Sequence, residues 1–483
     1  ASLGDLRLDY RSVSAGFPSA AMIGRICRCA TPQLPGVIMA RVRTFDQGGM
    51  HPRDIGLDTM SSPIRNAFLP HYLYIPLQQH IGSPAEAVVA PGDVVSRGDV
   101  IGKASGYVSV NIHTPLPGKV IAVQDHVTAT ADRVPTVVIE VEGRFSLKGQ
   151  VSRQTDAWKS LSRDEIISRM KEHGLVGMGG ATFPMHVKYS VPADKKITTL
   201  LVNAVECEPF LSADNRLVIE HGEDLVTGIE IALKALGVNR AIIGFEADMP
   251  EAVARMRGLV ANRSNIEVLV FPVKYPQGAE KQLVKAATGL EVPSGGLPLD
   301  IGVVVSNAGS LVALKEAVVD NKPLFERIVT VTGDAVEKPG NYKIAIGTRV
   351  SDVLAKVGLK KKPARIIIGG PMMGLAQYSD QVPVTKGTSG ILVLSARRAA
   401  VYRHRPCVRC GKCMTVCPMG LVPLMLVSRV ELGMDDEAKK HGLLDCIECG
   451  CCSAVCPSER HLSQAIKLGK LRHVAKKREA AGD

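Results

Sequence analysis

Two runs of cysteine near the carboxyl end constrain this chain more than any other feature. They read CVRCGKCMTVCP, beginning at Cys407, and CIECGCCSAVCP, beginning at Cys446. Both follow the pattern C-x-x-C-x-x-C-x-x-x-C-P, which is typical of [4Fe–4S] ligation. Three thiolates two residues apart can bind one cluster from a single tight loop, and the fourth, before a proline, reaches a second cluster. The spacing therefore predicts two adjacent clusters.

The ligand sets follow from that spacing. One cluster is assigned Cys407, Cys410, Cys413 and Cys456, and the other Cys446, Cys449, Cys452 and Cys417. A pair of zinc sites is the alternative, but structural zinc takes ligands in two pairs rather than four cysteines in one run. Cys451 breaks the spacing and is expected to pack beside the cluster without binding it. Two neighbouring clusters carry single electrons, so a source and an exit are needed.

Composition limits where such a chain works. Nine of the 12 cysteines lie between Cys407 and Cys456, a pattern of metal sites rather than disulfides, which indicates a reducing, cytoplasmic compartment. No stretch approaches the ~20 apolar residues of a membrane helix, so any membrane association is expected to be peripheral. The excess of 59 Lys and Arg over 47 Asp and Glu lacks a stripe of Arg and aromatic residues, so nucleic acid is not expected as a partner.

The amino-terminal part divides at about residue 38. Residues 1–38 lack periodicity and are expected to form a disordered or foreign leader rather than a functional segment built on Cys27 and Cys29; Met39 is a candidate native start. Residues 39–150 contain short apolar runs between turn signals, an all-β pattern. PGDVVSRGDVIG followed by IHTPLPGKVIAV resembles the barrel-sandwich hybrid of biotinyl and lipoyl carriers. ASGYVSVNI replaces the attachment lysine, which predicts a structural or docking module.

Residues 151–325 change to an α/β pattern. The segment LSRDEIISRMKEHG carries a capping box, Ser162 with Glu165, and predicts a helix that leads into a glycine-rich loop. Beyond it, four aliphatic runs alternate with helical stretches, which predicts a parallel sheet covered by helices. Residues 326–396 read as strand, turn, strand and short helix, typical of a small β-grasp domain. Residues 397–483 are helical and hold both cysteine runs.

The glycine-rich loop reads GMGGATFP. Gly177, Gly179 and Gly180 remove side chains where backbone N–H groups can approach an anion, and Pro184 is placed to open a helix whose amino terminus favours phosphate. The loop is not the usual dinucleotide fingerprint. A tight turn with close helix packing is therefore the alternative to an anion site.

Polar residues gather just past the ends of the predicted strands. They are Asn203, Glu206, Glu208, Tyr275, Glu280 and Asn307. The carboxyl ends of parallel strands meet at one edge of the sheet, where open α/β sheets bind their ligands. These side chains are therefore expected to line one site with the glycine-rich loop. Cys207, between two of the acids, is expected either near the ligand or in the core.

Together these motifs resemble a known family. Gly177–Lys188, Asn203–Glu208, Tyr275–Glu280 and Ser306–Ser310 are similar to the flavin- and NADH-binding subunit of respiratory complex I and of NAD-reducing hydrogenases. With the front β module, the β-grasp domain and two cluster runs, the chain resembles the C-subunit of Rnf-type ion-translocating ferredoxin:NAD oxidoreductases. GGMHPRD, IPLQQHIG, EVPSGGLP and GGPMMG also agree with that family.

The resemblance implies roles for individual residues. The phosphate and ring edge of FMN would be held by Gly177, Gly179, Gly180 and Lys188, and the flavin would be contacted by Asn203 and Glu206. NAD(H) would be framed by Phe183, Glu208 and Glu280. The ribityl side would be closed by Asn307 and Ser310, and the cofactor-binding set is completed by Tyr275 and Gly278. Hydride would pass between NADH and FMN, so no side chain need act as acid or base. Met178 and Val205 depart from complex I, which has arginine and aspartate there, and Ala279 replaces the first acid of its Gly-Glu-Glu triplet.

The fold class implied is a multidomain α/β protein. It comprises a barrel-sandwich hybrid, a Rossmann-like flavin and NADH domain, an SLBB-like β-grasp domain and a helical domain with two ferredoxin-like clusters. The activity implied is that of a peripheral subunit at the cytoplasmic face of the inner membrane, which passes single electrons from NADH through FMN and both clusters to partner subunits. Those partners would include an iron–sulfur subunit and, indirectly, ferredoxin. A soluble hydrogenase or formate dehydrogenase module, and a non-catalytic wiring subunit, are the alternatives.

Overall fold

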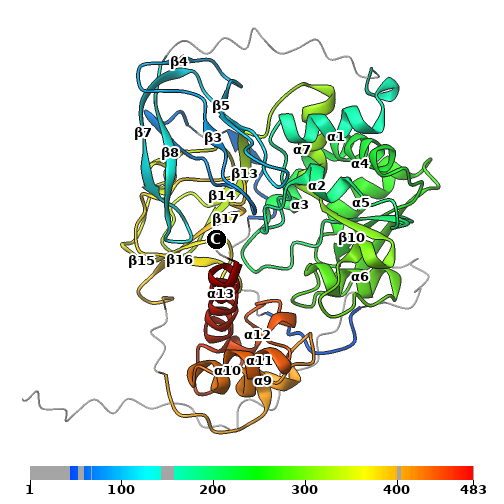
Figure 1. Ribbon diagram of the computed structural model, residues 1–483, viewed down its shortest axis with the longest axis vertical. Coiled ribbons are helices and arrows are strands. Elements are labelled where there is room, and N and C mark those ends of the chain that lie inside the picture. Colours follow the sequence, from blue (N-terminus) through cyan, green and yellow to red (C-terminus); the bar gives the residue numbers. More distant parts are fainter. Residues whose placement is uncertain (1–43, 53–58, 67, 143–156, 400–403, 482–483) are drawn as a thin grey trace, which may run out of the picture. The chain divides into compact units, whose positions relative to one another are not determined.

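The structure is a computed structural model that describes residues 44–52, 59–66, 68–142, 157–399 and 404–481 (Figure 1). These residues all belong to one compact unit. The predicted leader, with Cys27 and Cys29, lies outside the described residues. No helix in the described ranges is both long enough and apolar enough to cross a membrane.

Two antiparallel sheets form the first β module, as the all-β pattern predicts. Their strands are β2 (Tyr72–Pro76), β3 (Glu86–Ala87), β4 (Val94–Val95), β5 (Val100–Lys103), β6 (Ile112–His113), β7 (Gly118–Val127) and β8 (Arg133–Val141). The strand orders are β2-β8-β7-β4 and β3-β5-β6. Side chains alternate across a strand, and one face of each sheet buries Leu73, Ile75, Ile101 and Ile139 in a shared core.

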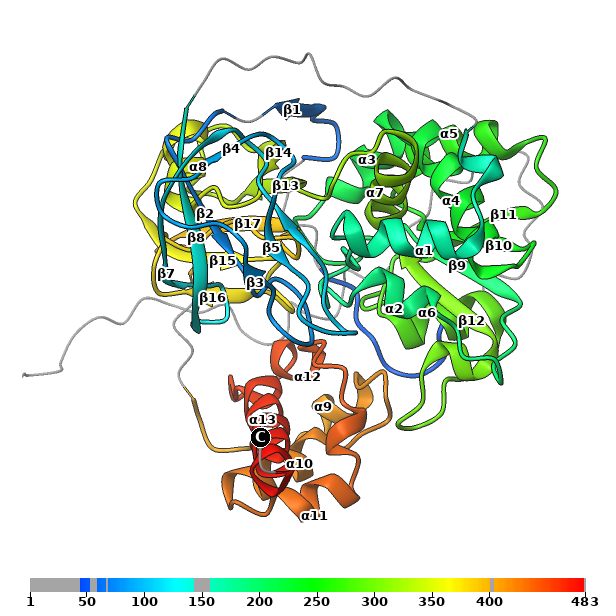
Figure 2. The same cartoon turned by 45° about the horizontal axis from the view of Figure 1, so that its top comes forward.

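A four-stranded parallel sheet lies at the centre of the next part, drawn in green in Figures 1 and 2. Its strands are β9 (Thr199–Asn203), β10 (Ala241–Glu246), β11 (Ile266–Phe271) and β12 (Val303–Asn307), in the order β11-β10-β9-β12. The accompanying helices are α1 (Arg163–Glu172), α2 (Met185–Tyr189), α3 (Ala213–Glu220), α4 (Gly222–Leu236), α5 (Pro250–Val260), α6 (Glu280–Thr288) and α7 (Ala308–Val319), with 3-10 turns η2 (Ala157–Ser160) and η3 (Pro298–Ile301). The predicted alternation of strand and helix is confirmed.

The start of α1 follows its sequence signal. The Ser162 hydroxyl accepts from the N–H of Glu165 at 3.3 Å, and the Glu165 carboxylate accepts from the N–H of Ser162 at 2.6 Å. These reciprocal bonds satisfy two amides that the helix itself leaves free. The helix ends at Glu172, and Gly174, with φ of +70°, starts the turn into the glycine-rich loop.

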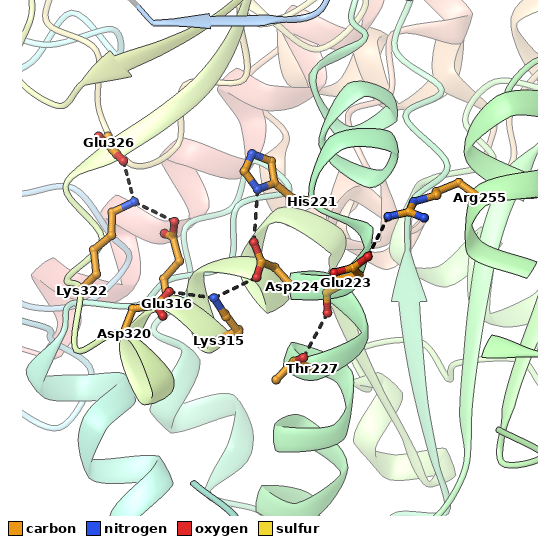
Figure 3. Close-up of polar contacts among 10 residues, drawn as sticks. All are labelled: His221, Glu223, Asp224, Thr227, Arg255, Lys315, Glu316, Asp320, Lys322 and Glu326. Carbon is orange, nitrogen blue, oxygen red and sulfur yellow. Dashed lines mark hydrogen bonds and ion pairs between the residues drawn. The ribbon is translucent and has the colours of Figure 1, made fainter. Parts of the chain in front are cut away.

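Helices α4 and α7 are joined by a polar network at the end of α7 distant from the sheet edge. Figure 3 shows Lys315 of α7 between Asp224, at 2.8 Å, and Asp320, at 2.9 Å. Burial alone would lower the pKa of Lys315, but the two carboxylates outweigh it and the pKa is raised. Lys322 similarly bridges Glu316 and Glu326. The network fixes the helix whose first turn reaches the site described below.

A six-stranded sheet of order β1-β14-β13-β17-β15-β16 forms the β-grasp part. Its elements are β1 (Ile64–Asn66), β13 (Glu326–Thr332), β14 (Gly340–Ala345), α8 (Val350–Val357), β15 (Pro363–Ile368), β16 (Leu375–Gln377) and β17 (Gly390–Ser395). β1 pairs in parallel with β14. Residues 64–66, which the sequence assigns to the front module, therefore complete another sheet.

The carboxyl-terminal part is helical, as predicted. It contains α9 (Lys412–Thr415), α10 (Pro423–Glu431), α11 (Asp435–Lys440), η4 (Leu443–Asp445), α12 (Cys451–Ala454) and α13 (Leu462–Ala481). The two cysteine runs share one backbone course. Arg409 and Glu448 have φ of +53° and +58°, and Gly411 and Gly450, which precede α9 and α12, have φ of +75° and +78°.

The Lys315 network predicts a stability effect. We expect Lys315→Met to lower stability by about 1–3 kcal/mol, because two carboxylates lose a buried cationic partner. Arg240→Met is the matched control, since the exposed pair of Arg240 with Glu267 contributes little. Thermal unfolding followed by circular dichroism measures both; equal melting temperatures in the two variants would contradict the prediction.

Candidate functional site

The order of the parallel sheet marks where a ligand belongs. β9 is the first strand of the sheet in sequence and β12 the last, yet they are neighbours, with Asn203 opposite Asn307 at their carboxyl ends. The chain turns from β9 towards β10 on one side, while β12 lies on the other. Open α/β sheets bind ligands at such a point. The segments that follow β9 and β12 therefore share one edge of the sheet, where a ligand is expected.

The glycine-rich loop is attached to this edge by α7. The N–H of Met178 donates to the Ser310 hydroxyl at 2.8 Å, and the N–H of Ser310 donates to Asn307 at 3.3 Å. Asn307 is thereby the amino-terminal cap of α7. The N–H of Gly177 donates to the carbonyl of Phe183 at 2.8 Å, which closes the loop on itself. Asn307 and Ser310 thus lie against the loop, as expected.

The tip of the loop presents free backbone donors. Among the described contacts, the N–H groups of Gly179, Gly180 and Ala181 have no hydrogen-bond partner, and all three residues are exposed. Gly180 has φ of +112°, and a Cβ added there would meet nothing within 4 Å. Adjacent free amides in a turn form an anion-binding concavity. Pro184 precedes α2 as predicted, but α2 has five residues, so its dipole adds little.

A second group of predicted residues meets beside β12. Lys188 donates to the carbonyl of Val305 at 2.9 Å and pairs with Glu280 at 3.2 Å. Asn203 donates to the carbonyl of Gly278 at 2.8 Å. The segments that follow β9, β11 and β12 are therefore joined, and an ammonium group lies at their common edge.

Beneath the loop lies a set of charges, two half-buried acids and one buried arginine, that the sequence analysis missed in part. Glu206 accepts from the N–H groups of Asp214 and Asn215 at 2.9 and 2.8 Å, and Asn307 donates to Asp214 at 2.6 Å. Burial and then the Asp214 carboxylate raise the pKa of Glu206. Arg327 of β13, 4% exposed, bonds the carbonyl of Met178 at 3.3 Å and offsets the two acids. The sequence could have indicated Arg327, because it is an arginine within the otherwise strand-like run ERIVTVT.

Glu208 and Tyr275 lie away from the glycine-rich loop contacts. The Glu208 carboxylate accepts from the N–H groups of Met372 and Met373 at 2.6 and 3.1 Å, in the GGPMMG loop of the β-grasp part. The Tyr275 hydroxyl donates to the carbonyl of Cys449 at 2.7 Å. Both residues thus join neighbouring parts of the chain. Phe183 is half-buried, with its carbonyl engaged by the loop.

The two departures from complex I are core positions here. Met178 is 8% exposed and Val205 is fully buried, each within an apolar cluster. Apolar side chains at these positions pack inward, so neither leaves an unpaired polar group at the crevice.

The second cysteine run surrounds a cavity. Its lining includes Cys417, Cys446, Cys449 and Cys452, the four predicted ligands of one cluster, together with Cys451. Burial and then the thiols of Cys446, Cys449 and Cys417 raise the pKa of Cys452 to about 12. Thiols this close and this buried need a bound cation to become thiolates. N–H groups of Glu448 and Leu421 donate to sulfurs of Cys446 and Cys417 at 3.4 and 3.3 Å.

The first run is more open. Burial and then the thiols of Cys407 and Cys410 raise the pKa of Cys413. Cys456 and Cys413 pack against the same apolar cluster. Cys410 is exposed, and Arg405, Arg409 and Lys412 are exposed around it.

The two remaining described cysteines also pack against other side chains. Cys451 is fully buried with Tyr275 and Cys449. Cys207 accepts from the N–H of Gly278 at 3.2 Å and packs at the edge of the same cluster. The His51 ring bonds the carbonyl of Val273. Trp158 packs in the apolar core.

These residues fit the implied cofactors. Free amides at Gly179–Ala181 suit a phosphate, and thiols around one cavity suit a [4Fe–4S] cluster.

Four family models match the chain in sequence order. They are the RnfC barrel sandwich hybrid domain at residues 44–144, the Nuo51 FMN-binding domain at 170–316, the SLBB domain at 328–376 and the 4Fe-4S dicluster domain at 399–457. These matches confirm the predicted fold class and exclude the zinc alternative for the cysteine runs.

Curated relatives cover most of the chain. The C-subunit of the proton-translocating ferredoxin:NAD(+) oxidoreductase complex of Clostridium ljungdahlii is 42% identical over 90% of this chain and 94% of its own length. The Na(+)-translocating counterpart of Acetobacterium woodii is 40% identical over 90% and 98%. A crystal structure of an NAD+-reducing [NiFe]-hydrogenase aligns with 67% of this chain and 63% of its own, at 19% identity and a TM-score of 0.46, which carries no inference about the site.

Proposed function

The chain belongs to the C-subunit family of ion-translocating ferredoxin:NAD(+) oxidoreductase complexes, and from this membership we propose how its residues admit electrons. It is the electron-input subunit of such a complex, with FMN, two [4Fe–4S] clusters and NAD(H). This conclusion rests on one observation: the same chain contains an FMN-binding domain and a 4Fe-4S dicluster domain. FMN exchanges a hydride with NAD(H) and electrons singly with iron–sulfur clusters.

The glycine-rich loop is the proposed phosphate site. Gly179 and Gly180 supply free amides, Gly177 shapes the turn, and Lys188 adds positive charge at the sheet edge. Asn203, Glu206, Asn307, Ser310 and Gly278 form the wall of the crevice. Arg327 supports this wall from below by holding the carbonyl of Met178.

The nucleotide is proposed to enter over the same edge, framed by Phe183 and Glu280. Glu208, expected to frame NAD(H), and Tyr275, of the same cofactor-binding set, also contact neighbouring parts of the chain: Glu208 bonds the β-grasp loop and Tyr275 the second cysteine run. They hold the crevice next to the cluster that receives its electrons.

The two clusters are proposed to act in series. The second, on Cys446, Cys449, Cys452 and Cys417, is the inner one, since Tyr275 of the α/β part contacts its loop. The first, on Cys407, Cys410, Cys413 and Cys456, is the exit, since Cys410 is exposed. Arg405, Arg409 and Lys412 surround the exit, which favours an acidic partner.

Other subunits of the complex are the partners of this chain. An iron–sulfur subunit is the proposed acceptor at the exit, ferredoxin the indirect one, and the cytoplasmic face of the membrane the proposed location. Relatives are named for proton or for Na(+) translocation.

Anaerobic purification followed by an NADH titration tests the function. We expect about eight irons and one FMN per chain, with NADH bleaching both chromophores in visible absorbance and electron paramagnetic resonance (EPR). Eight irons without flavin, and no response to NADH after FMN is added back, would leave a wiring subunit. If the chain co-purifies with soluble hydrogenase subunits rather than with integral membrane subunits, it would instead be the NADH module of a soluble hydrogenase or formate dehydrogenase.

The cysteine assignment gives a direct contrast. We expect Cys449→Ser to abolish one EPR signal, because the substitution removes a ligand at the cavity. Cys451→Ser is the matched control, two residues away and also buried, and should keep both signals and the full iron content. Loss of a cluster in the control would assign Cys451 as a ligand.

The phosphate site is tested at Lys188. Lys188→Met is expected to weaken FMN binding about 10- to 100-fold, the loss of one charge-assisted contact. Flavin fluorescence on adding FMN to deflavinated protein measures the dissociation constant. Lys285→Met, which removes an ammonium from the surface of α6, should leave it unchanged. An equal effect in both variants would mean that general charge, not this site, attracts FMN.

A further inference from the structure

A short segment near the start of the described chain lies along the loop that carries Tyr275. We call Thr44–His51, which includes most of the GGMHP motif, the strap. Met50 and Tyr275 exchange both backbone hydrogen bonds, each at 2.8 Å. The Thr44 hydroxyl donates to Gln277 at 2.7 Å, and the His51 ring bonds the carbonyl of Val273 at 2.7 Å. Lys274 closes the contact by donating to the carbonyl of Phe45 at 2.8 Å.

The opposite side of the strap lies on the cysteine domain. The N–H of Gly49 donates to the carbonyl of Val416 at 3.0 Å. Gly48 has φ of +63°, and a side chain there would collide with the carbonyl oxygen of Cys417. A side chain on Gly420 would in turn meet the Gln47 amide at 2.7 Å. Glycine at position 48 therefore permits backbone-to-backbone contact beside a proposed cluster ligand, and glycine at 420 leaves room for the Gln47 side chain.

Tyr275 contacts the loop that carries Cys449, a lining residue of the cavity. Its side chain is 1% exposed, and its hydroxyl donates to the carbonyl of Cys449 at 2.7 Å. Its ring packs with Cys449 and Cys451, and Met50 and Val416 lie at the edge of that cluster. A single loop of the α/β part is thus tied to Cys417 through the strap and to Cys449 through the hydroxyl.

The β-grasp loop adds a third contact. A Cβ on Gly450 would lie 2.6 Å from the carbonyl oxygen of Met372, and Glu208 holds the N–H of Met372 at 2.6 Å. The inner cluster loop is therefore packed against backbone on several sides. Among the described contacts, none of the same kind joins residues 407–413 to the α/β part.

We propose that the strap and Tyr275 form a clamp that fixes the inner cluster against the flavin crevice, and that Tyr275 is a positioning residue that also sets the potential of this cluster. The hydroxyl directs its positive hydrogen toward the cluster loop, which stabilises the reduced, more negative cluster. Hydrogen bonds around the ligands tune potentials in this way. The inference rests on the proposed function in taking the second cluster as the inner one.

Tyr275→Phe tests the hydroxyl. Potentiometric titration followed by EPR should show one of the two cluster signals shifted to lower potential, namely the signal that Cys446→Ser abolishes. The other signal and the iron content should stay unchanged. Tyr342→Phe is the matched control, because the Tyr342 hydroxyl also donates to a backbone carbonyl at 2.7 Å but lies in the β-grasp part. No shift, a shift of both signals, or the same shift in the control would overturn the proposal.

Gly48→Ala tests the strap by a second readout. Amide hydrogen exchange of the full chain should become faster at residues 273–277 and 416–420 and stay the same at 118–141. Gly258→Ala, on the open surface of α5, is the matched control and should change neither. Unchanged exchange in Gly48→Ala would overturn the clamp. Flavin content and bleaching by NADH are recorded separately. If the protein does not react with NADH but Tyr275→Phe still shifts the potential of one cluster, the proposed function fails and the clamp is still supported.

Discussion

The parallel pairing of β9 with β12 is the constraint on which the cofactor end of this molecule depends. It places Asn203 and Asn307 opposite each other, so the turns that follow both strands must share one edge. Asn307 then caps α7, Ser310 in the first turn of α7 holds Met178, and the glycine-rich loop is fixed with its amides outward. Each step uses a backbone group that a helix end or turn leaves free.

Charges buried below that edge keep the loop in place. Two half-buried acids, Glu206 and Asp214, are stabilised because backbone N–H groups, Asn307 and Arg327 surround them. Arg327 comes from β13, so the β-grasp part supplies the counter-charge for the α/β part. The proposed flavin site therefore depends on two domains and not on the sheet alone.

Local patterns predicted much of this from sequence. The capping box at Ser162, the parallel sheet and the two cysteine runs each depend on spacing within a few residues, which sequence displays directly. Contacts between distant segments could not be predicted that way. β1 joining β14, Glu208 meeting Met372, and the strap reaching Tyr275 all depend on how domains pack, and motifs such as GGMHP reveal that glycine is needed without revealing what approaches it.

The two cluster loops have the same backbone and different surroundings, and that difference gives the pair a direction. Arg409 and Glu448 occupy equivalent left-handed positions. Glu448 is neutralised by Lys470 at 2.7 Å, and its loop is buried under Tyr275 and Met372, whereas Arg409 lies exposed beside exposed Cys410 and Lys412. A repeated loop with identical ligand spacing would give two equivalent sites. Packing on one copy and exposed positive charge on the other are the two features behind the proposal that one cluster faces the flavin and the other a negatively charged partner.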